Sequence, residues 1–439
     1  MLRYCTNIAS LFVILGQLAI VAGVTAQDLA MVQITRPASS SDYVSANGAS
    51  LDDLNARMLA SNLELLAART RVAQAEARVL QSGLRPNPAV EFQHNNDRLL
   101  TNSGEREDEL TVHQPLEIGG RRGRRIDLAR AGVERMRYEV AELERQRTAD
   151  LATLVGQALG EADRLYALER ITDLNETLRT ATNLRVKAGD ASRYEFALTE
   201  AEAVRIESEM LRARSQLDSL MIEIKTLAGV PLTEPIKLRE GQLDVTAMNL
   251  SLDEAVGIAF DSRPDLKASR VAEQEAEARI KLAAVEGKPD VGAIFGFKRP
   301  SVSVGGFEAS DWQLKVGVSV SLPVFNRNQG AIREAAAALE EARLHRQSLE
   351  QLIRRDVVIA HRRVEQARRD LKLYEDRLVP LAQGNVRMAR LGFEMGELRL
   401  VEYINEQRRL SDYESGYAQA KAELFKARVE LGIAVGKRL

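Results

Sequence analysis

The chain has 439 residues, of which 45% are hydrophobic and 28% are charged, and its formal net charge is −2 at pH 7. This hydrophobic content is enough for a folded core and excludes a disordered tail. The small net charge excludes a general attraction to nucleic acid or to an anionic membrane. Because aromatic residues make up only 5%, the composition favours long helices packed through small side chains over an aromatic-rich globular core.

The first 26 residues have the pattern of an export signal. Arg3 precedes an apolar run from Ile8 to Val24, and the small residues Val24-Thr25-Ala26 form a cleavage pattern. We therefore expect a signal peptide at residues 1–26. The only cysteine, Cys5, lies inside this segment. The mature chain is then expected to have no disulfide, no cysteine metal site and no cysteine for a lipoprotein anchor.

Residues 27–50 are polar and rich in Ser and Ala, which predicts an extended N-terminal arm. The rest of the chain is a tandem duplication. Two fixed offsets relate its halves: 201 residues separate Ser50-Leu51-Asp52-Asp53 from Ser251-Leu252-Asp253-Glu254, and 207 residues separate Gly189 from Gly396 and Gly229 from Gly436. We assign repeat 1 to residues 51–230, a linker to residues 231–250 and repeat 2 to residues 251–439.

Both repeats have the same predicted order of elements: two helices, a pair of strands and a long helical hairpin. Helices are expected at about 51–82 and 252–285, and strands at about 88–96, 108–118, 289–299 and 311–324. From Ile126 onward, apolar residues step by three and four positions, as in a coiled coil. The first long helix, residues 120–187, would measure about 100 Å at about 1.5 Å per residue.

The hairpins are expected to turn at about 187–192 and 392–397, where Gly189 and Gly396 stand, and Pro380 predicts a kink. The resulting fold class is mainly α with a small β part.

The strand expected at residues 312–322 indicates whether the protein enters a membrane. Its even positions are apolar and its odd positions are polar or Gly, which is the alternation of a membrane strand between lipid and water. We predict a lipid-facing row of Trp312, Leu314, Val316, Val318 and Val320 and a pore-facing row of Gln313, Lys315 and Ser319. A half-buried soluble sheet shows the same period, so this alternative stays open for one strand.

Strand number favours a membrane barrel shared between copies of the chain. After the signal, no stretch approaches the roughly 18 apolar residues of a spanning helix, so any crossing has to use strands. Four strands cannot close a barrel, and an open sheet edge is not tolerated in lipid. Three copies would give a 12-stranded transmembrane β-barrel, with their long helices forming a trimeric α-barrel beneath it.

Two motifs give the chain a family resemblance. They are Gln114-Pro115-Leu116-Glu117-Ile118-Gly119-Gly120-Arg121-Arg122-Gly123 and Ser321-Leu322-Pro323-Val324-Phe325-Asn326-Arg327-Asn328-Gln329-Gly330. With the duplicated plan over residues 50–437, they make the chain resemble the TolC-like outer membrane efflux family, and most closely its CzcC-like branch of heavy-metal cation efflux. The resemblance implies a homotrimer in the Gram-negative outer membrane, with a closed periplasmic tip. It also implies a periplasmic adaptor and a proton-driven inner-membrane efflux pump as partners.

The hairpin turns carry the candidate gate. Glu195 and Glu402 each follow a turn glycine, Gly189 or Gly396, by six residues. In the resembled family, acids at this level line the narrowed tip, so three copies would form a cation-favouring ring. Asn405 stands where some relatives carry a further acid. The alternative is that both glutamates are ordinary helix-surface residues.

The remaining motifs predict neither catalysis nor cofactor binding. Arg121-Arg122-Gly123-Arg124-Arg125 is expected near lipid phosphates or a neighbouring subunit and not on nucleic acid. The histidines have no metal-site spacing, although three copies of a pore-facing His113 would meet on the axis. No nucleophile or phosphate-loop motif occurs. We therefore expect a passive export duct and no enzyme. Drug efflux, type I secretion and a soluble periplasmic coiled-coil adaptor or scaffold remain alternatives.

Overall fold

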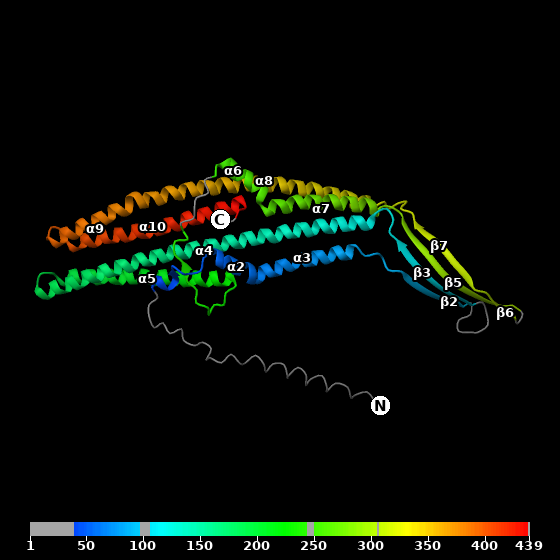
Figure 1. The fold of residues 1–439 in the computed structure, drawn as a ribbon, viewed down its shortest axis with the longest axis horizontal. Helices are drawn as coiled ribbons and strands as arrows, with labels where there is room; N and C mark the ends of the chain where they lie inside the picture. The colour runs from blue at the N-terminus through cyan, green and yellow to red at the C-terminus, as the bar shows by residue number, and fades with distance from the viewer. Residues whose placement is uncertain (1–38, 97–105, 244–249, 305–306, 438–439) are drawn as a thin grey trace, which may run out of the picture. The chain divides into compact units, whose positions relative to one another are not determined.

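The computed structural model describes residues 39–96, 106–243, 250–304 and 307–437 (Figure 1). The predicted signal peptide with Cys5, and residues 27–38 of the predicted arm, lie outside the described residues.

Each repeat opens with two helices, and the first of each pair begins at a capping box. Helix α2, Leu51–Ser61, follows Ser50, whose side chain accepts a hydrogen bond from the Asp53 N–H, while the Asp53 carboxylate accepts one from the Ser50 N–H. Such reciprocal bonds satisfy the unpaired donors of a helix start. Helix α6, Leu252–Ser262, begins in the same way. Helices α3, Leu63–Ser82, and α7, Pro264–Glu286, follow them.

The predicted long hairpins are confirmed. Helix α4, Arg121–Ala188, and helix α5, Arg193–Ala228, form the first; helix α8, Gln329–Leu373, a π-helical turn η1, Tyr374–Leu378, and helices α9, Val379–Glu394, and α10, Leu400–Val435, form the second. Gly189 and Gly396 have φ values of 84° and 78°, a conformation that ends a helix and that glycine adopts without strain. Pro380, where a kink was predicted, is the second residue of α9, just after η1. None of the described helices combines the length and apolarity needed to cross a membrane.

The two repeats pack together along α4 and α10. Helix α4 contacts α3, α5, α7 and α10, and α10 also contacts α8. The helices of the hairpins therefore follow the lateral order α5, α4, α10, α8, with α9 continuing α8. A Cβ atom added at Gly156 would lie 2.4 Å from Cδ1 of Phe425, and one at Gly160 would lie 2.5 Å from Cβ of Ala422. These glycines let α4 and α10 approach closely.

The strands form one antiparallel sheet, in which β2, β3, β5 and β7 lie side by side (Figure 1). They are β2, Ala89–Asn96; β3, Arg106–Leu116; β5, Asp290–Val304; β6, Phe307–Ser310; and β7, Gln313–Ser321. In this sheet β2 pairs with β3, β3 with β5, and β5 with both β6 and β7.

The strand boundaries predicted for repeat 2 were partly wrong. Strand β5 extends to Val304, five residues beyond the expected end. The strand expected at about 311–324 is present as β7, but it is preceded by a separate part, β6, that was not predicted. Both parts keep one register against β5, since Ser310 pairs with Ser301 and Gln313 pairs with Lys298. The interruption lies opposite Arg299 and Pro300. Because proline has no N–H to donate, it interrupts a ladder without shifting the register.

The end of the predicted polar arm is folded against the helices, which corrects the expectation of an extended segment. Helix α1, Ser40–Tyr43, leads into β1, Val44–Ser45, which pairs in parallel with β4, Leu238–Arg239, in the predicted linker. Tyr43 is buried, and its hydroxyl donates to Asp218 on α5 at 2.8 Å. The Ser40 hydroxyl donates to Glu169 on α4 at 2.6 Å.

Candidate functional site

One face of the sheet is apolar along β2, β3, β5 and β7, with Gln114 as a polar exception on β3. Cross-strand partners in register point to the same side of a sheet, and this apolar face consists of Val90 and Phe92 on β2, Leu110, Val112 and Leu116 on β3, Val291, Ala293, Phe295 and Phe297 on β5, and Leu314, Val316, Val318 and Val320 on β7. Val318 is 69% exposed and Phe92 is 66% exposed. The single chain therefore presents a continuous apolar surface that its own helices do not cover.

The apolar face ends at a row of polar and aromatic side chains beside the interruption between β6 and β7. The His94 ring and the Asp108 carboxylate form a hydrogen bond, 2.6 Å between Nδ1 and Oδ1, and Asp108 pairs with Arg299 in the register of β3 and β5. The Arg299 guanidinium lies over the Trp312 ring, 5.6 Å from its centroid. Trp312 is the only tryptophan of the chain. The predicted row from Trp312 to Val320 thus runs along one side, with its aromatic member at the boundary.

The opposite, polar face carries charges that are paired between strands. Lys315 on β7 forms an ion pair with Glu109 on β3, and Lys298 on β5 lies 2.7 Å from Glu107. His113 Nε2 lies 3.6 Å from Glu91. The predicted pore-facing residues Gln313, Lys315 and Ser319 all belong to this side.

Arginines at the start of α4 join the sheet to the helices. Arg121 forms an ion pair with Asp290 at the start of β5, Arg122 donates to the Gly83 carbonyl after α3, and Arg125 forms an ion pair with Glu117. The sequence suggested lipid phosphates or a neighbouring subunit as the partners of this cluster. Within one chain, Arg121, Arg122 and Arg125 therefore bind residues at the place where the sheet meets α3 and α4.

The two predicted gate glutamates occupy equivalent positions. Glu195 accepts from the Ser192 N–H at 2.9 Å, and Glu402 accepts from the Arg399 N–H at 3.0 Å, so both cap the first turn of their helices. Both are half-buried, whereas Asn405 is exposed. Capping fixes the position of each carboxylate at the start of its helix.

The two hairpins are linked by an ion cluster that sequence reasoning missed. Glu202 on α5 is only 2% exposed. It accepts from Arg205 on its own helix, at 2.6 Å, and from Arg408 on α10, at 2.7 Å. Burial acts to raise the pKa of this carboxyl, but the hydrogen bonds from Arg205 and Arg408 outweigh it, so its pKa lies below the ordinary value. The three-residue spacing of Glu202 and Arg205 is visible in the sequence, but no sequence pattern indicates that Arg408 on α10 contacts Glu202.

The described histidines lie apart from one another along the chain. His345 lies near Glu341 at 3.7 Å, and His361 contacts the Leu250 carbonyl at 3.2 Å. Within the described residues, no group of three or more His, Cys, Asp or Glu side chains is arranged to hold a metal ion.

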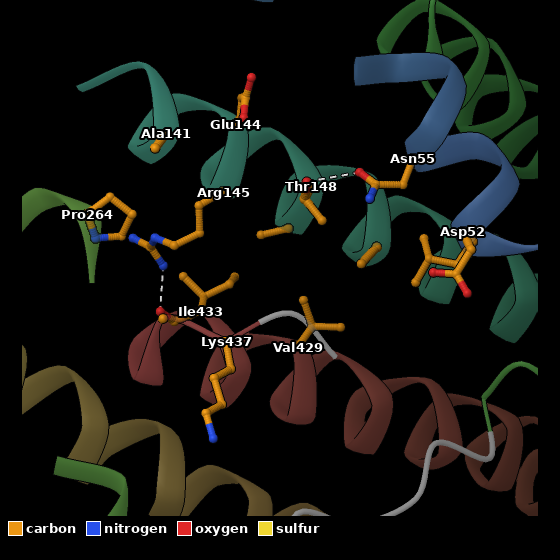
Figure 2. Close-up of a pocket in the computed structure, with 14 residues that line it drawn as sticks. Asp52, Asn55, Ala141, Glu144, Arg145, Thr148, Pro264, Val429, Ile433 and Lys437 are labelled. Carbon is orange, nitrogen blue, oxygen red and sulfur yellow. Dashed lines mark hydrogen bonds between the residues drawn. The ribbon is translucent and has the colours of Figure 1, made fainter. Parts of the chain in front are cut away.

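A cavity of about 300 Å³ lies where the repeats meet, lined by residues of α2, α4 and α10 (Figure 2). Figure 2 shows Arg145 reaching from α4 to the Ile433 carbonyl, a bond of 2.5 Å, and Asn55 bonded to Thr148 at 2.9 Å. Arg145 is also held by Glu142 at 2.6 Å. Arg145, Asn55 and Thr148 are thus hydrogen-bonded to other residues of the chain where the repeats meet.

A family comparison accounts for both repeats. Residues 54–230 and 256–437 match the family described as outer membrane efflux protein. The chain belongs to this outer membrane efflux family. It is therefore an outer-membrane protein with a large periplasmic helical part, in a family of efflux channels and not of enzymes. Membership favours the channel over the soluble adaptor.

Relatives of this efflux protein include heavy-metal resistance proteins. It is 24% identical over 381 residues to the cobalt-zinc-cadmium resistance protein CzcC of Cupriavidus metallidurans, covering 86% of this chain and 87% of that protein. It is 27% identical over 300 residues to the nickel-cobalt-cadmium resistance protein NccC of Alcaligenes xylosoxydans xylosoxydans, covering 66% and 65%. The solved structure of CusC has the same fold, with a TM-score of 0.73 at 16% identity over 92% of this chain and 96% of that one.

Proposed function

We propose that this efflux protein is the outer-membrane duct of a tripartite efflux system, through which substrate passes passively from the periplasm to the exterior. The observation that carries the proposal is the uncovered apolar face of the sheet, with Phe295 and Phe297 each 53% exposed and Leu314 67% exposed. Large contiguous apolar surfaces are rare on proteins that face only water. Lipid is the surrounding that suits this face, and an aqueous pore suits the paired charges opposite.

The edges of the sheet support a closed ring of copies. Within the described residues, β2 pairs only with β3, and β7 pairs only with β5. These unpaired edges cannot remain open in lipid. Because one edge is β2 and the other is β7, each copy joins its neighbour through unlike surfaces, and such contacts form a ring when the rotation between copies closes. Three copies, each with β2, β3, β5 and the β6–β7 path, make the proposed 12-stranded barrel above a 12-helix tube.

The height of the apolar face suits a bilayer. Ten residue steps separate Trp312 from Leu322, which is about 33 Å at about 3.3 Å per residue. A strand tilt of about 40° reduces this to about 25 Å, the height of the apolar band of outer-membrane barrels. The helical hairpins then extend into the periplasm, where an adaptor and an inner-membrane pump are the proposed partners.

Fractionation tests the duct directly. The full chain should remain in the outer membrane after high-salt and carbonate washing, because lipid-facing strands and not surface charge hold it there. Chemical cross-linking of intact membranes should yield a trimer as the largest species. Recovery of the protein in the soluble periplasm, or a monomer in the membrane, would contradict the proposal.

We propose heavy-metal cations as the exported substrate, moved by a proton-coupled pump. The names of CzcC and NccC support this substrate class. Deletion of the gene should lower bacterial tolerance of Co²⁺, Ni²⁺, Zn²⁺ or Cd²⁺ and leave tolerance of dyes and detergents unchanged, with a plasmid copy restoring it. The reverse pattern would favour drug efflux, and retention of a secreted protein in the deletion strain would favour type I secretion.

We further propose that Glu195 and Glu402 line the periplasmic constriction. Their equal distance from the two hairpin turns supports this, since a threefold ring would bring six carboxylates together. Such a ring repels itself, so divalent cations should bind there and lower the conductance of the channel.

The double variant Glu195→Gln with Glu402→Gln tests this ring in planar-bilayer recordings. We expect the block by divalent cations to disappear while the trimer remains intact. Unchanged block and unchanged cation preference would show that both glutamates act only as helix caps. Asn405→Asp should have the opposite effect and strengthen the block.

A further inference from the structure

The second hairpin contains one irregular turn in an otherwise continuous helix. From Gln329 to Glu394 the backbone is helical, but Tyr374–Leu378 forms a π-turn, in which the Val379 N–H bonds to the Tyr374 carbonyl five residues earlier. A π-turn accommodates one more residue than an α-turn. Pro380, which has no N–H to donate, follows directly.

The buried seam of this helix changes phase at that turn. Its members before the turn are spaced by seven residues, and so are those after it, but eight residues separate the last of the first group from the first of the second: Ile353, Ala360, Ala367 and Tyr374, then Ala382 and Ala389. The first three and last two are at most 7% exposed. A heptad seam supports one face of a helix only while its spacing is kept, so the sequence holds one residue too many here.

An exposed apolar stripe changes phase at the same place. It consists of Leu352, Ile359 and Leu373 before the turn, which are 40%, 44% and 46% exposed, and of Leu381, Met388 and Met395 after it, which are 62%, 65% and 67% exposed. Eight residues again separate Leu373 from Leu381. In an uninterrupted α-helix, one extra residue would rotate the second group by about 100° away from the first.

We infer that the π-turn absorbs this extra residue so that the stripe stays on one face, and that this face binds α5 of the next copy of the chain. The inference rests on the proposed ring, in which α8–α9 and α5 are the two outer helices of each copy. Helix α5 offers Val204, Leu211 and Ile222 on its exposed side, at 65%, 58% and 53%. The stripe and this side of α5 are therefore complementary apolar surfaces at opposite flanks of one chain.

The stripe on α8–α9 and the exposed side of α5 lie at similar distances from the hairpin turns. Leu178 of α4 packs in one cluster with Ala389 of α9, Ile404 of α10 and Leu198 of α5, so the two hairpin ends lie level. Leu381 and Val204 each stand fifteen residues from their turn glycine, Gly396 or Gly189. These two side chains are thus expected to meet across the subunit contact.

A single-residue deletion tests the inference. Deletion of Arg377 combined with Pro380→Ala removes the extra residue and lets the helix continue as a regular α-helix. Both the seam and the stripe then keep a spacing of seven, so we expect the trimer to form as in the wild type. Pro380→Ala alone should also form trimers, because the buried seam still requires the π-turn.

The repeat supplies a matched control. Arg170 in α4 is the equivalent of Arg377 by the 207-residue offset, and it lies in a regular stretch of helix. Its deletion shifts every later seam position by one residue, so we expect trimers to be lost, with or without Pro380→Ala. Equal loss of trimers in the Arg170 and Arg377 deletions would overturn the inference, as would equal retention.

Disulfide cross-linking gives a second readout that separates the inference from the proposed ring. The pair Leu381→Cys and Val204→Cys should form covalent trimers in otherwise wild-type protein and in the Arg377 deletion with Pro380→Ala. If wild-type protein is not trimeric, the proposed ring fails. If it is trimeric but this cysteine pair does not cross-link, the ring stands and the assignment of the stripe to α5 is wrong.

Discussion

The helices and the sheet differ in how far their large apolar side chains are exposed. In the helical part, Phe425 is 1% exposed and packs against the backbone at Gly156, and Leu165 is fully buried. In the sheet, Phe295 is 53% exposed and Val318 is 69% exposed. The helices thus bury one core within the chain and leave narrow apolar rows exposed, such as Leu381, Met388 and Met395. The sheet leaves its apolar face uncovered, so its stability depends on surroundings that one chain does not supply.

The largest expected effect comes from opening the helical core. Phe425→Ala removes a fully buried ring between α4 and α10 and should lower the free energy of unfolding by about 3–5 kcal/mol. Chemical denaturation of the detergent-solubilised protein measures it. Phe325→Ala is the matched control, because Phe325 is 91% exposed and its loss should have far less effect. An equal loss of stability in both variants would mean that Phe425 is not part of the helical core.

A charge on each face of β7 tests whether the sheet has two environments. Val318→Arg places a guanidinium on the apolar face and should cost about 2–4 kcal/mol near the bilayer midplane, abolishing assembly in the outer membrane. Ser319→Arg adds the same group to the polar face and should be mild. The amount of trimer in washed outer membranes measures both. Similar damage from the two would contradict a membrane strand.

The Glu202 cluster sharpens the contrast, because here the helical part buries a charge. Glu202→Gln keeps the shape but weakens charge-assisted hydrogen bonds between α5 and α10, at a cost of about 1–3 kcal/mol. Because folding lowers the pKa of Glu202, its contribution is present above the ordinary carboxyl pKa of about 4.3. It is lost as the pH falls through the lowered value.

Unfolding measured as a function of pH checks this sign. The difference in stability between wild type and Glu202→Gln should be constant at neutral pH and should shrink in acid. A difference that grew in acid would mean that Glu202 is protonated in the folded chain.

Patterns with a strict period were predictable from the sequence. The alternation at Trp312–Leu322 identified the apolar row of β7, and the 207-residue offset located both turn glycines, Gly189 and Gly396. The strand alternation and the helix-ending glycines are each set by residues close in sequence, and the offset shows that the glycines occur once in each repeat. The duplicated plan and the two motifs together then gave the family resemblance.

Features that depend on distant packing were not predictable. Arg408 reaches Glu202 only because α10 lies beside α5, and Arg121 finds Asp290 only once the sheet meets the helices. Pro300 suggested no divided strand, since its effect falls on the strand opposite. At Pro380 the sequence indicated an irregularity, but its form as a π-turn followed from the seam on both sides.

The central claim is that the apolar face contacts lipid, and Trp312 reports on it in the unmodified protein because it is the only tryptophan. Its fluorescence should be measured in vesicles whose lipids carry quenchers at defined depths. We expect strong quenching by shallow quenchers near the headgroups, weaker quenching by quenchers at the bilayer centre, and little quenching by aqueous iodide. Strong quenching by iodide with none by any lipid quencher would place Trp312 in water and contradict the account.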